Sequence, residues 1–244
     1  MRHMNNSKNT ALIMAAGNGN RMKSGKDITG EDINKVFLPL FEKPILAHTL
    51  GVFQNCEFIN SIIVVTRKCD IDKVLNIKTR YNISKLETVI TGGTTRQSSV
   101  LCGLDKINDT SGFVFIHDGA RCLIKESTVK TCFLCAQKYG AAAPGVRVKD
   151  SLKQIDENGF IKNDIDRSFA VNIQTPQIFN AGEIIKCHKK AKQEGYLATD
   201  DTAVFTKYKD SVYVSEGDYE NIKITTPEDL TVAKQIIMRK ENKK

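Results

Sequence analysis

Between residues 11 and 144, short apolar runs alternate with stretches that carry apolar residues at helical spacing. The apolar runs are typical of buried strands. The predicted strands are Ala11–Ala15, Ser61–Thr66, Glu87–Thr91, Gly112–His117 and Ala141–Pro144. The predicted helices between them are Ile45–Gln54, Ile71–Lys78, Arg96–Ile107 and Ser127–Tyr139. This alternation predicts βαβ units, and therefore an α/β fold with a mostly parallel sheet flanked by helices.

The pattern changes after residue 145. Val146–Asp156 reads as a strand, and Ile161–Ile173 reads as an extended segment that returns after the turn Asp156–Gly159. An Asn-Gly pair in such a turn favours a β-hairpin. The hairpin is either a local flap or an arm exchanged between two subunits, and the pattern is compatible with both.

The last part of the chain returns to helices and one strand. A helix over Ala181–Glu194 precedes a turn at Thr199–Asp201, a short helix and a strand over Val212–Ser215. A final helix is predicted to start at Pro227, because Thr226 can cap it and proline suits the first helical position. The acidic residues that follow complement the helix dipole.

Three loops that follow predicted strands carry polar residues of chemical interest. Ligands of parallel sheets bind outside the carboxyl ends of the strands, where these loops gather. After the first strand, Gly17-Asn-Gly-Asn-Arg21 can bring backbone N–H groups close to an anion. Arg21 and Lys35 would add positive charge where a triphosphate needs it. The loop lacks both the GK[ST] ending of a P-loop and a spaced GxGxxG, and an ordinary strand-to-helix turn remains the alternative.

The other polar segments each allow two interpretations. Gly92–Ser99 can cap a helix or bind a polar base edge. The carboxylate of Asp118 can bind Mg²⁺ or orient a hydroxyl, or it can form an ion pair with Arg121. Asp200-Asp201 can be a helix cap. Lys223 interrupts a predicted apolar strand and either lies along the apolar surface or reaches a phosphate.

Length and cysteine content restrict the class of protein. A chain of 244 residues fits one α/β domain or a domain with an appendage. The chain has no apolar stretch near the roughly 18 residues that span a bilayer, so no membrane partner is expected. Seven cysteines without regular spacing indicate reduced thiols and a cytoplasmic location. Cys132 and Cys135 lack a second pair of zinc ligands.

The net charge of +8 and a pI near 9.0 suit either a nucleic-acid partner or a small anionic substrate. The lysines are scattered and tryptophan is absent, so no nucleic-acid partner is expected. No Ser-His-Asp order is visible and the four histidines are dispersed, which argues against nucleophilic or zinc-dependent hydrolysis. The residue types suit phosphoryl or nucleotidyl transfer, where positioning and charge stabilisation suffice.

In combination, these segments resemble a known enzyme family. The matching segments, in family order, are Ala15-Ala-Gly-Asn-Gly-Asn-Arg21-Met22, Lys35, Gly92-Gly93 with Arg96 and Ser99, His117–Arg121, Ala143-Pro144, Lys149-Asp-Ser151-Leu-Lys153, Asp166-Arg167, Gln174–Phe179, Thr199–Asp201, Asn221–Thr225 and Pro227–Leu230. The chain is similar to the 2-C-methyl-D-erythritol 4-phosphate cytidylyltransferases, with ribitol 5-phosphate cytidylyltransferases as close relatives of that family.

The resemblance implies a Rossmann-like nucleotidyltransferase fold over residues 1–244, with 146–173 as an inserted dimerisation arm of a homodimer. It implies that CTP and a sugar-alcohol phosphate are the substrates and that Mg²⁺ is the cofactor. The reaction would join CTP and 2-C-methyl-D-erythritol 4-phosphate to give 4-diphosphocytidyl-2-C-methyl-D-erythritol and pyrophosphate. A ribitol 5-phosphate cytidylyltransferase, or a non-catalytic nucleotide-binding regulator on the same fold, is the alternative.

The resemblance also implies roles for single residues. Arg21 and Lys35 would be catalytic, stabilising charge on the α-phosphate. The expected CTP-site residues are Ala15, Ala16, Gly17, Gly93 and Ser99. Asp118, also the expected metal ligand, and Arg121 would meet the sugar phosphate or the metal. The residues expected to position the substrate phosphate are Ser151 and Arg167 from the partner's arm, Thr175 and Lys223.

Some positions depart from the family pattern. Lys35 is flanked by Asn34 and Val36, where the family usually has proline and glutamine, and the loop before it is longer. Lys23 and Lys26 therefore compete with Lys35 as the active-site lysine.

Overall fold

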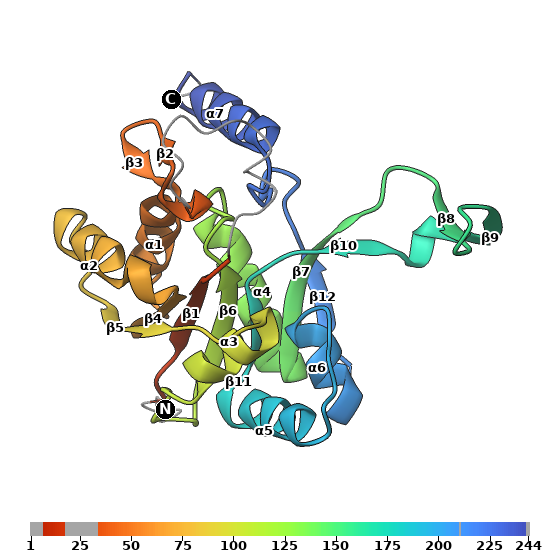
Figure 1. The fold of residues 1–244 in the computed structure, drawn as a ribbon, viewed down its shortest axis with the longest axis horizontal. Coiled ribbons are helices and arrows are strands. Elements are labelled where there is room, and N and C mark those ends of the chain that lie inside the picture. The colour runs from red at the N-terminus through yellow and green to blue at the C-terminus, as the bar shows by residue number, and fades with distance from the viewer. Residues whose placement is uncertain (1–6, 18–33, 210, 243–244) are drawn as a thin grey trace.

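A central mixed sheet organises the protein, shown in Figure 1 as a computed structural model that describes residues 7–17, 34–209 and 211–242. The strand order is β10-β7-β11-β6-β1-β4-β5, with β12 beside β7. The strands are β1 (Thr10–Ala15), β4 (Ser61–Thr66), β5 (Leu86–Thr91), β6 (Phe113–Asp118), β7 (Ala141–Arg147), β10 (Val171–Ile173), β11 (Gln177–Asn180) and β12 (Tyr213–Glu216). Strands β1, β4, β5 and β6 pair in parallel, which confirms the predicted mostly parallel sheet.

Helices and two small strand pairs complete the described fold. The helices are α1 (Ile45–Asn55), α2 (Ile71–Arg80), α3 (Arg96–Leu104), α4 (Glu126–Tyr139), α5 (Ala181–Gln193), α6 (Asp201–Tyr208) and α7 (Pro227–Glu241). The short 3-10 turns are η2 (Lys35–Phe37), η3 (Lys68–Asp70) and η4 (Arg167–Phe169). The pairs outside the main sheet are β2 (Pro39–Leu40) with β3 (Lys43–Pro44), and β8 (Leu152–Ile155) with β9 (Ile161–Ile165). None of the described helices is long and apolar enough to cross a membrane.

The alternating side chains of β1 explain why helices cover both faces of the sheet. Ala11, Ile13 and Ala15 pack into a core with α1, α2 and α4. Leu12 points to the opposite face, into a core with α3, α5 and α6. Successive residues of a strand point to opposite faces, so an apolar run such as Ala11–Ala15 requires cover on both sides.

The sheet differs from the prediction at two places. β11 is a strand that the apolar pattern did not predict, and it pairs antiparallel with both β6 and β7. Residues 221–225, predicted as a strand, form no strand, although Ile224 is buried in a third core beneath α7. The Ile224 N–H donates to the backbone oxygen of Ala120, 2.9 Å away, so the segment is attached to the loop after β6.

The predicted hairpin is present and projects from the body of the protein (Figure 1). β8 and β9 pair antiparallel outside the main sheet, and Gly159 adopts a φ of 87° in the turn between them. Several large apolar side chains of this arm are exposed, and Phe169 is 90 % exposed. The strongly exposed side chains of the arm are Ile155, Phe160, Ile161, Ile165 and Phe169. A two-stranded hairpin is marginally stable alone in water.

Candidate active site

A cavity of about 530 Å³ lies at the carboxyl ends of β1 and β6. Its size falls within the range of small-molecule sites. The residues that line it come from the end of β1, the start of η2, the loop into α3, the end of β6 and the segment before α7. They are Met14, Ala15, Ala16, Gly17, Asn34, Lys35, Val36, Gly93, Thr94, Thr95, Arg96, Ser99, Asp118, Ala120, Lys223 and Thr225.

The charged lining of the cavity is mostly basic. The basic residues of the described lining are Lys35, Arg96 and Lys223, and its carboxylate is that of Asp118. Lys223 Nζ lies 3.0 Å from Asp118 Oδ2, and Arg96 Nε lies 3.8 Å from Asp118 Oδ1. Arg121, mostly buried beside the cavity, places Nε 3.5 Å from Asp118 Oδ2. The excess of cations suits a polyanionic ligand such as a nucleoside triphosphate or a phosphate ester.

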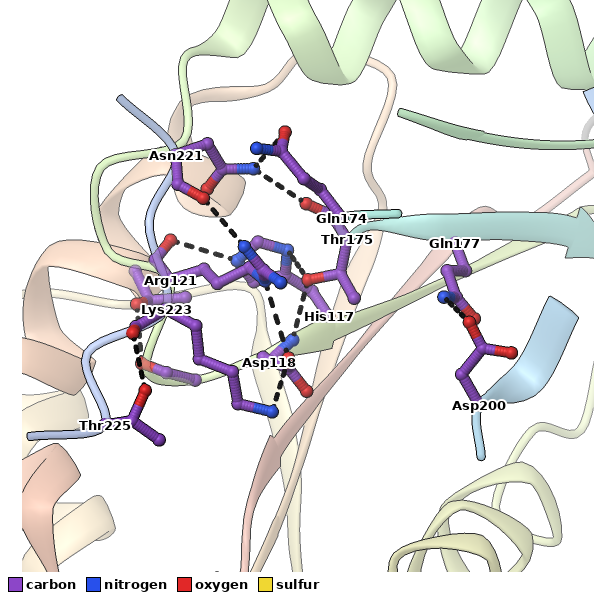
Figure 2. A network of polar contacts seen from close by, with 12 residues as sticks. His117, Asp118, Arg121, Gln174, Thr175, Gln177, Asp200, Asn221, Lys223 and Thr225 are labelled. Carbon is purple, nitrogen blue, oxygen red and sulfur yellow. Dashed lines mark hydrogen bonds and ion pairs between the residues drawn. The ribbon is translucent and has the colours of Figure 1, made fainter. Parts of the chain in front are cut away.

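The surrounding cations keep Asp118 ionised. Burial by itself would raise the pKa of this carboxyl, but Lys223, Arg96 and Arg121 together outweigh burial and lower it well below its usual range. Figure 2 shows Lys223 and Arg121 reaching Asp118 from two different segments. At neutral pH the carboxylate therefore acts as a fixed negative charge that orders the cations around it.

Asn34 determines where Lys35 lies. The Asn34 side chain is buried, and its Nδ2 donates to the backbone oxygen of Ala15 at 2.7 Å and to Asp70 Oδ2 at 3.3 Å. Its Oδ1 accepts the Val36 N–H at 3.4 Å and caps η2. These bonds attach the segment to the carboxyl end of β1, so that Lys35 lines the cavity.

The glycines after β5 allow the backbone to approach β1 closely. A Cβ at Gly92 would lie 2.9 Å from the Ala16 Cβ and 2.7 Å from Ser99 Oγ. A Cβ at Gly93 would lie 2.4 Å from Ser98 Oγ. Side chains at either position would push the start of α3 away from the cavity. Thr95 and Ser98 form a capping box there, as the Gly92–Ser99 segment predicted for a helix start.

Arg96 is held from behind by two buried residues. Its Nη2 lies 2.8 Å from Asp201 Oδ2, and Asp201 Oδ1 lies 3.1 Å from Nε2 of the buried His188. Burial would raise the pKa of Asp201, but Arg96 and His188 outweigh it and lower that pKa. The N-terminal turn of α6 thus fixes a cation of the cavity wall on α3.

Sequence comparison agrees with this geometry. The family model of 2-C-methyl-D-erythritol 4-phosphate cytidylyltransferase matches residues 10–240. The protein of that name from Clostridium novyi (strain NT) is 44 % identical over 232 residues, which cover 95 % of this chain and 97 % of the relative. The chain belongs to the 2-C-methyl-D-erythritol 4-phosphate cytidylyltransferase family.

Two further relatives support the assignment. The 2-C-methyl-D-erythritol 4-phosphate cytidylyltransferase of Clostridium acetobutylicum is 41 % identical, with 95 % of this chain and 98 % of the relative covered. The crystal structure of 4-diphosphocytidyl-2C-methyl-D-erythritol synthase from Anaerococcus prevotii DSM 20548 superposes with a TM-score of 0.80 at 30 % identity. That superposition covers 95 % of this chain and 99 % of the solved chain, so the fold shared with this cytidylyltransferase family extends over almost the whole chain.

The structure brings most of the residues implied by the family resemblance into one place. Those that line the cavity are Ala15, Ala16, Gly17, Lys35, Gly93, Ser99, Asp118 and Lys223. Arg121 and Thr175 lie beside the cavity, in contact with Asp118 and in the polar network of Figure 2. Ser151 and Arg167 are exposed on the arm, outside this chain's cavity lining. Arg21, Lys23 and Lys26 lie outside the described residues.

Asn34, Arg96 and Thr225 are among the cavity residues that were not predicted as site residues for the cytidylyltransferase. Asn34 looked like a departure from the family pattern, yet its hydrogen bonds place Lys35. Arg96 was part of the matching segments. Its position three residues after Gly93, at the start of a helix, could have identified it as a site residue. Thr225 lies two residues after Lys223, and its hydroxyl donates to the Lys223 backbone oxygen at 2.9 Å.

The acidic residues near the cavity limit how the structure can hold a metal. Among the described residues, no group of three or more His, Cys, Asp or Glu side chains is arranged for a metal ion. The described cavity lining offers the Asp118 carboxylate. Mg²⁺ typically binds through one or two carboxylates together with substrate phosphates and water. The donor set thus fits a metal that arrives with a triphosphate.

Proposed function

We propose that this protein transfers a cytidylyl group from CTP to 2-C-methyl-D-erythritol 4-phosphate. The observation that carries the proposal is the basic cavity built from the family's own segments and lined by Lys35, Arg96, Lys223 and Asp118. An oxygen of the acceptor phosphate forms a bond to the α-phosphorus of CTP. The bond from that phosphorus to the bridging oxygen of the β-phosphate breaks, and pyrophosphate leaves with the electron pair. The acceptor phosphate is already ionised, so the step needs no strong base.

The proposal assigns the nucleotide to the β1 side of the cavity. Backbone N–H groups at Ala15–Gly17 and the polar groups of Gly93–Ser99 bind the cytosine and the phosphates. Lys35, together with Arg21, stabilises the charge that develops at the α-phosphate. Mg²⁺, held by triphosphate oxygens and the Asp118 carboxylate, would neutralise phosphate charge. Arg121 and Lys223 face the acceptor.

The first test measures pyrophosphate release by the purified protein with CTP, Mg²⁺ and each candidate acceptor. We expect release with 2-C-methyl-D-erythritol 4-phosphate and a product of the mass of the diphosphocytidyl alcohol. Release with ribitol 5-phosphate instead would support the ribitol enzyme, and no turnover with either acceptor would support a nucleotide-binding regulator. Comparable kcat/KM with UTP would contradict base recognition through hydrogen bonds.

The proposal includes a homodimer in which each arm completes the partner's site. It rests on the exposed apolar side chains of the arm and on Arg167, which is exposed there and donates through Nη1 to the backbone oxygen of Lys149. A guanidinium on an exchanged arm can hold an acceptor phosphate through two parallel hydrogen bonds. A cytoplasmic location is also proposed, on the irregular spacing of the seven cysteines.

Mixing two inactive variants tests the shared site. We expect Lys35→Ala and Arg167→Ala homodimers to be inactive, while a heterodimer contains one site with both residues intact and one doubly damaged site. Recovery would reach at most about half of the wild-type activity if the sites act independently. Heterodimers verified by mass spectrometry that recover no activity would place Arg167 outside the partner's site.

A further inference from the structure

His117 is a buried histidine at the end of β6 that links two separate loops. Its side chain is inaccessible to solvent, so it does not line the cavity. Its Nδ1 lies 3.0 Å from Thr175 Oγ1, and its Nε2 lies 3.2 Å from the backbone oxygen of Arg121. Figure 2 shows the imidazole between these two partners.

The partners determine which ring nitrogen carries the hydrogen. The backbone oxygen of Arg121 can only accept, so Nε2 must be the donor. The other ring nitrogen, Nδ1, lies against the Thr175 hydroxyl, and Thr175 Oγ1 also accepts the Asp118 N–H at 3.1 Å.

The same contacts connect His117 to the charged residues of the cavity. Arg121 Nη1 donates to the backbone oxygen of Asn221 at 2.8 Å, and Asn221 Nδ2 donates to the backbone oxygen of Thr175 at 3.1 Å. Together with the hydrogen bonds of His117, these bonds form a closed network (Figure 2). The network joins the end of β6, the loop after β6, the segment after β10 and the segment before Lys223. His117 therefore connects the loop that carries Arg121 to the segment that carries Thr175.

We infer that His117, which donates through Nε2 to the Arg121 backbone oxygen and contacts Thr175 through Nδ1, is a positioning residue that sets the Arg121 loop and the Thr175 segment for the acceptor phosphate ester. The inference rests on the proposed function. His117 acts through other groups, because it is buried and its two nitrogens are both used.

Two amide substitutions distinguish the contribution of the Nε2 contact from that of the Nδ1 contact. In His117→Gln the amide reaches the Nε2 position and can donate to the Arg121 backbone oxygen. In His117→Asn the shorter amide reaches only the Nδ1 position, so the bond to Arg121 is lost. We expect His117→Asn to raise the KM for the acceptor at least tenfold with the KM for CTP within twofold of wild type. His117→Gln should restore the acceptor KM to within about threefold.

A matched control comes from another histidine that bonds to a backbone oxygen. His48 Nε2 lies 2.9 Å from the Leu40 oxygen, away from the network. His48→Asn should leave both KM values unchanged. If His117 only supports folding, His117→Asn would lower kcat through loss of folded enzyme while both KM values stay at the wild-type value, and that result would overturn the inference. Equal damage in His117→Gln and His117→Asn would also overturn it.

Nitrogen-15 NMR of wild-type imidazole rings tests the tautomer without any substitution and without substrate. We expect His117, assigned by the cross-peak lost in His117→Gln, to show hydrogen on Nε2 at pH 7, because that nitrogen donates to the Arg121 backbone oxygen. A ring with hydrogen on Nδ1 alone would overturn the inference even if the enzyme is active. Absence of cytidylyl transfer by the wild-type protein, with the expected tautomer observed, would instead contradict the proposed function.

Discussion

The substitution Asp201→Asn is expected to loosen Arg96 and so to weaken both the fold and CTP binding. Asparagine keeps the shape of the side chain and an oxygen that can accept from His188. It removes the negative charge that lies 2.8 Å from Arg96 Nη2. Of its two ion pairs among the described residues, Arg96 then keeps the one with Asp118, whose Oδ1 lies 3.8 Å from Arg96 Nε.

The burial of the two partners gives the expected magnitude. Removing one partner of a fully buried ion pair costs about 3–5 kcal/mol, whereas an exposed pair contributes about 1 kcal/mol or less. The Asp201 side chain is 1 % exposed and that of Arg96 is 32 % exposed. The pair lies between the two limits, so we expect the free energy of unfolding to fall by about 2 kcal/mol.

A double-mutant cycle measures this interaction directly. Urea denaturation of wild type, Asp201→Asn, Arg96→Gln and the double variant gives a coupling energy, which we expect to be about 2 kcal/mol. A coupling below about 0.5 kcal/mol would refute the reasoning, because the pair would then behave as an exposed one. Steady-state kinetics of the same variants should show a higher KM for CTP in both single variants.

Three other predictions follow from single sites. Lys223→Met removes the cation 3.0 Å from the cavity carboxylate, and kcat/KM for the acceptor should fall by about 10²-fold in steady-state assays; an unchanged value would contradict the assigned role. Gly103→Ala should lower the free energy of unfolding by about 1–3 kcal/mol, because its Cβ would lie 2.4 Å from a leucine methyl group of β1. In the control Gly51→Ala, in α1, the added Cβ meets nothing within 4 Å, so the free energy of unfolding should rise by up to about 1 kcal/mol. Equal changes of the two variants in urea denaturation would refute the packing argument. The pKa of His117 falls from 6.5 to about 4 on folding, so between these pH values the unfolded chain binds a proton at His117 that the folded chain does not. A contribution on the order of 3 kcal/mol to the free energy of unfolding is therefore present above pH 6.5 and is lost as the pH falls toward 4. His117→Gln should show a shallower loss of urea stability over that range, and equal pH slopes would contradict burial of a neutral ring.

The sequence by itself determined those elements whose causes lie within a few neighbouring residues. The capping box of α3 forms between Thr95 and Ser98, and that of α7 between Thr226 and Asp229 with proline at the helix start. Apolar runs such as Ser61–Thr66 became strands buried on both faces. The Asn-Gly turn produced the hairpin, because its geometry depends on the turn residues themselves.

Much of the cavity could also be anticipated from the sequence, because the carboxyl ends of parallel strands converge. Ala15 and Asp118 end β1 and β6, which are neighbours in the sheet, so their loops meet whatever the surrounding sequence. The residues implied by the family resemblance at these loops therefore lie in one cavity. Their contribution to the reaction remains a prediction.

Only the tertiary structure decided which distant segments pair. β11 lies antiparallel between β6 and β7, and nothing in its four residues specifies those partners. Residues 221–225 have the alternation of a strand but form none, since Ile224 is buried beneath α7 and its N–H is used by the loop after β6. A strand requires a neighbour to pair with, and that neighbour is chosen by the whole fold. The same holds for His117, Thr175 and Arg121, whose protonation and hydrogen bonds depend on burial among segments far apart in the sequence.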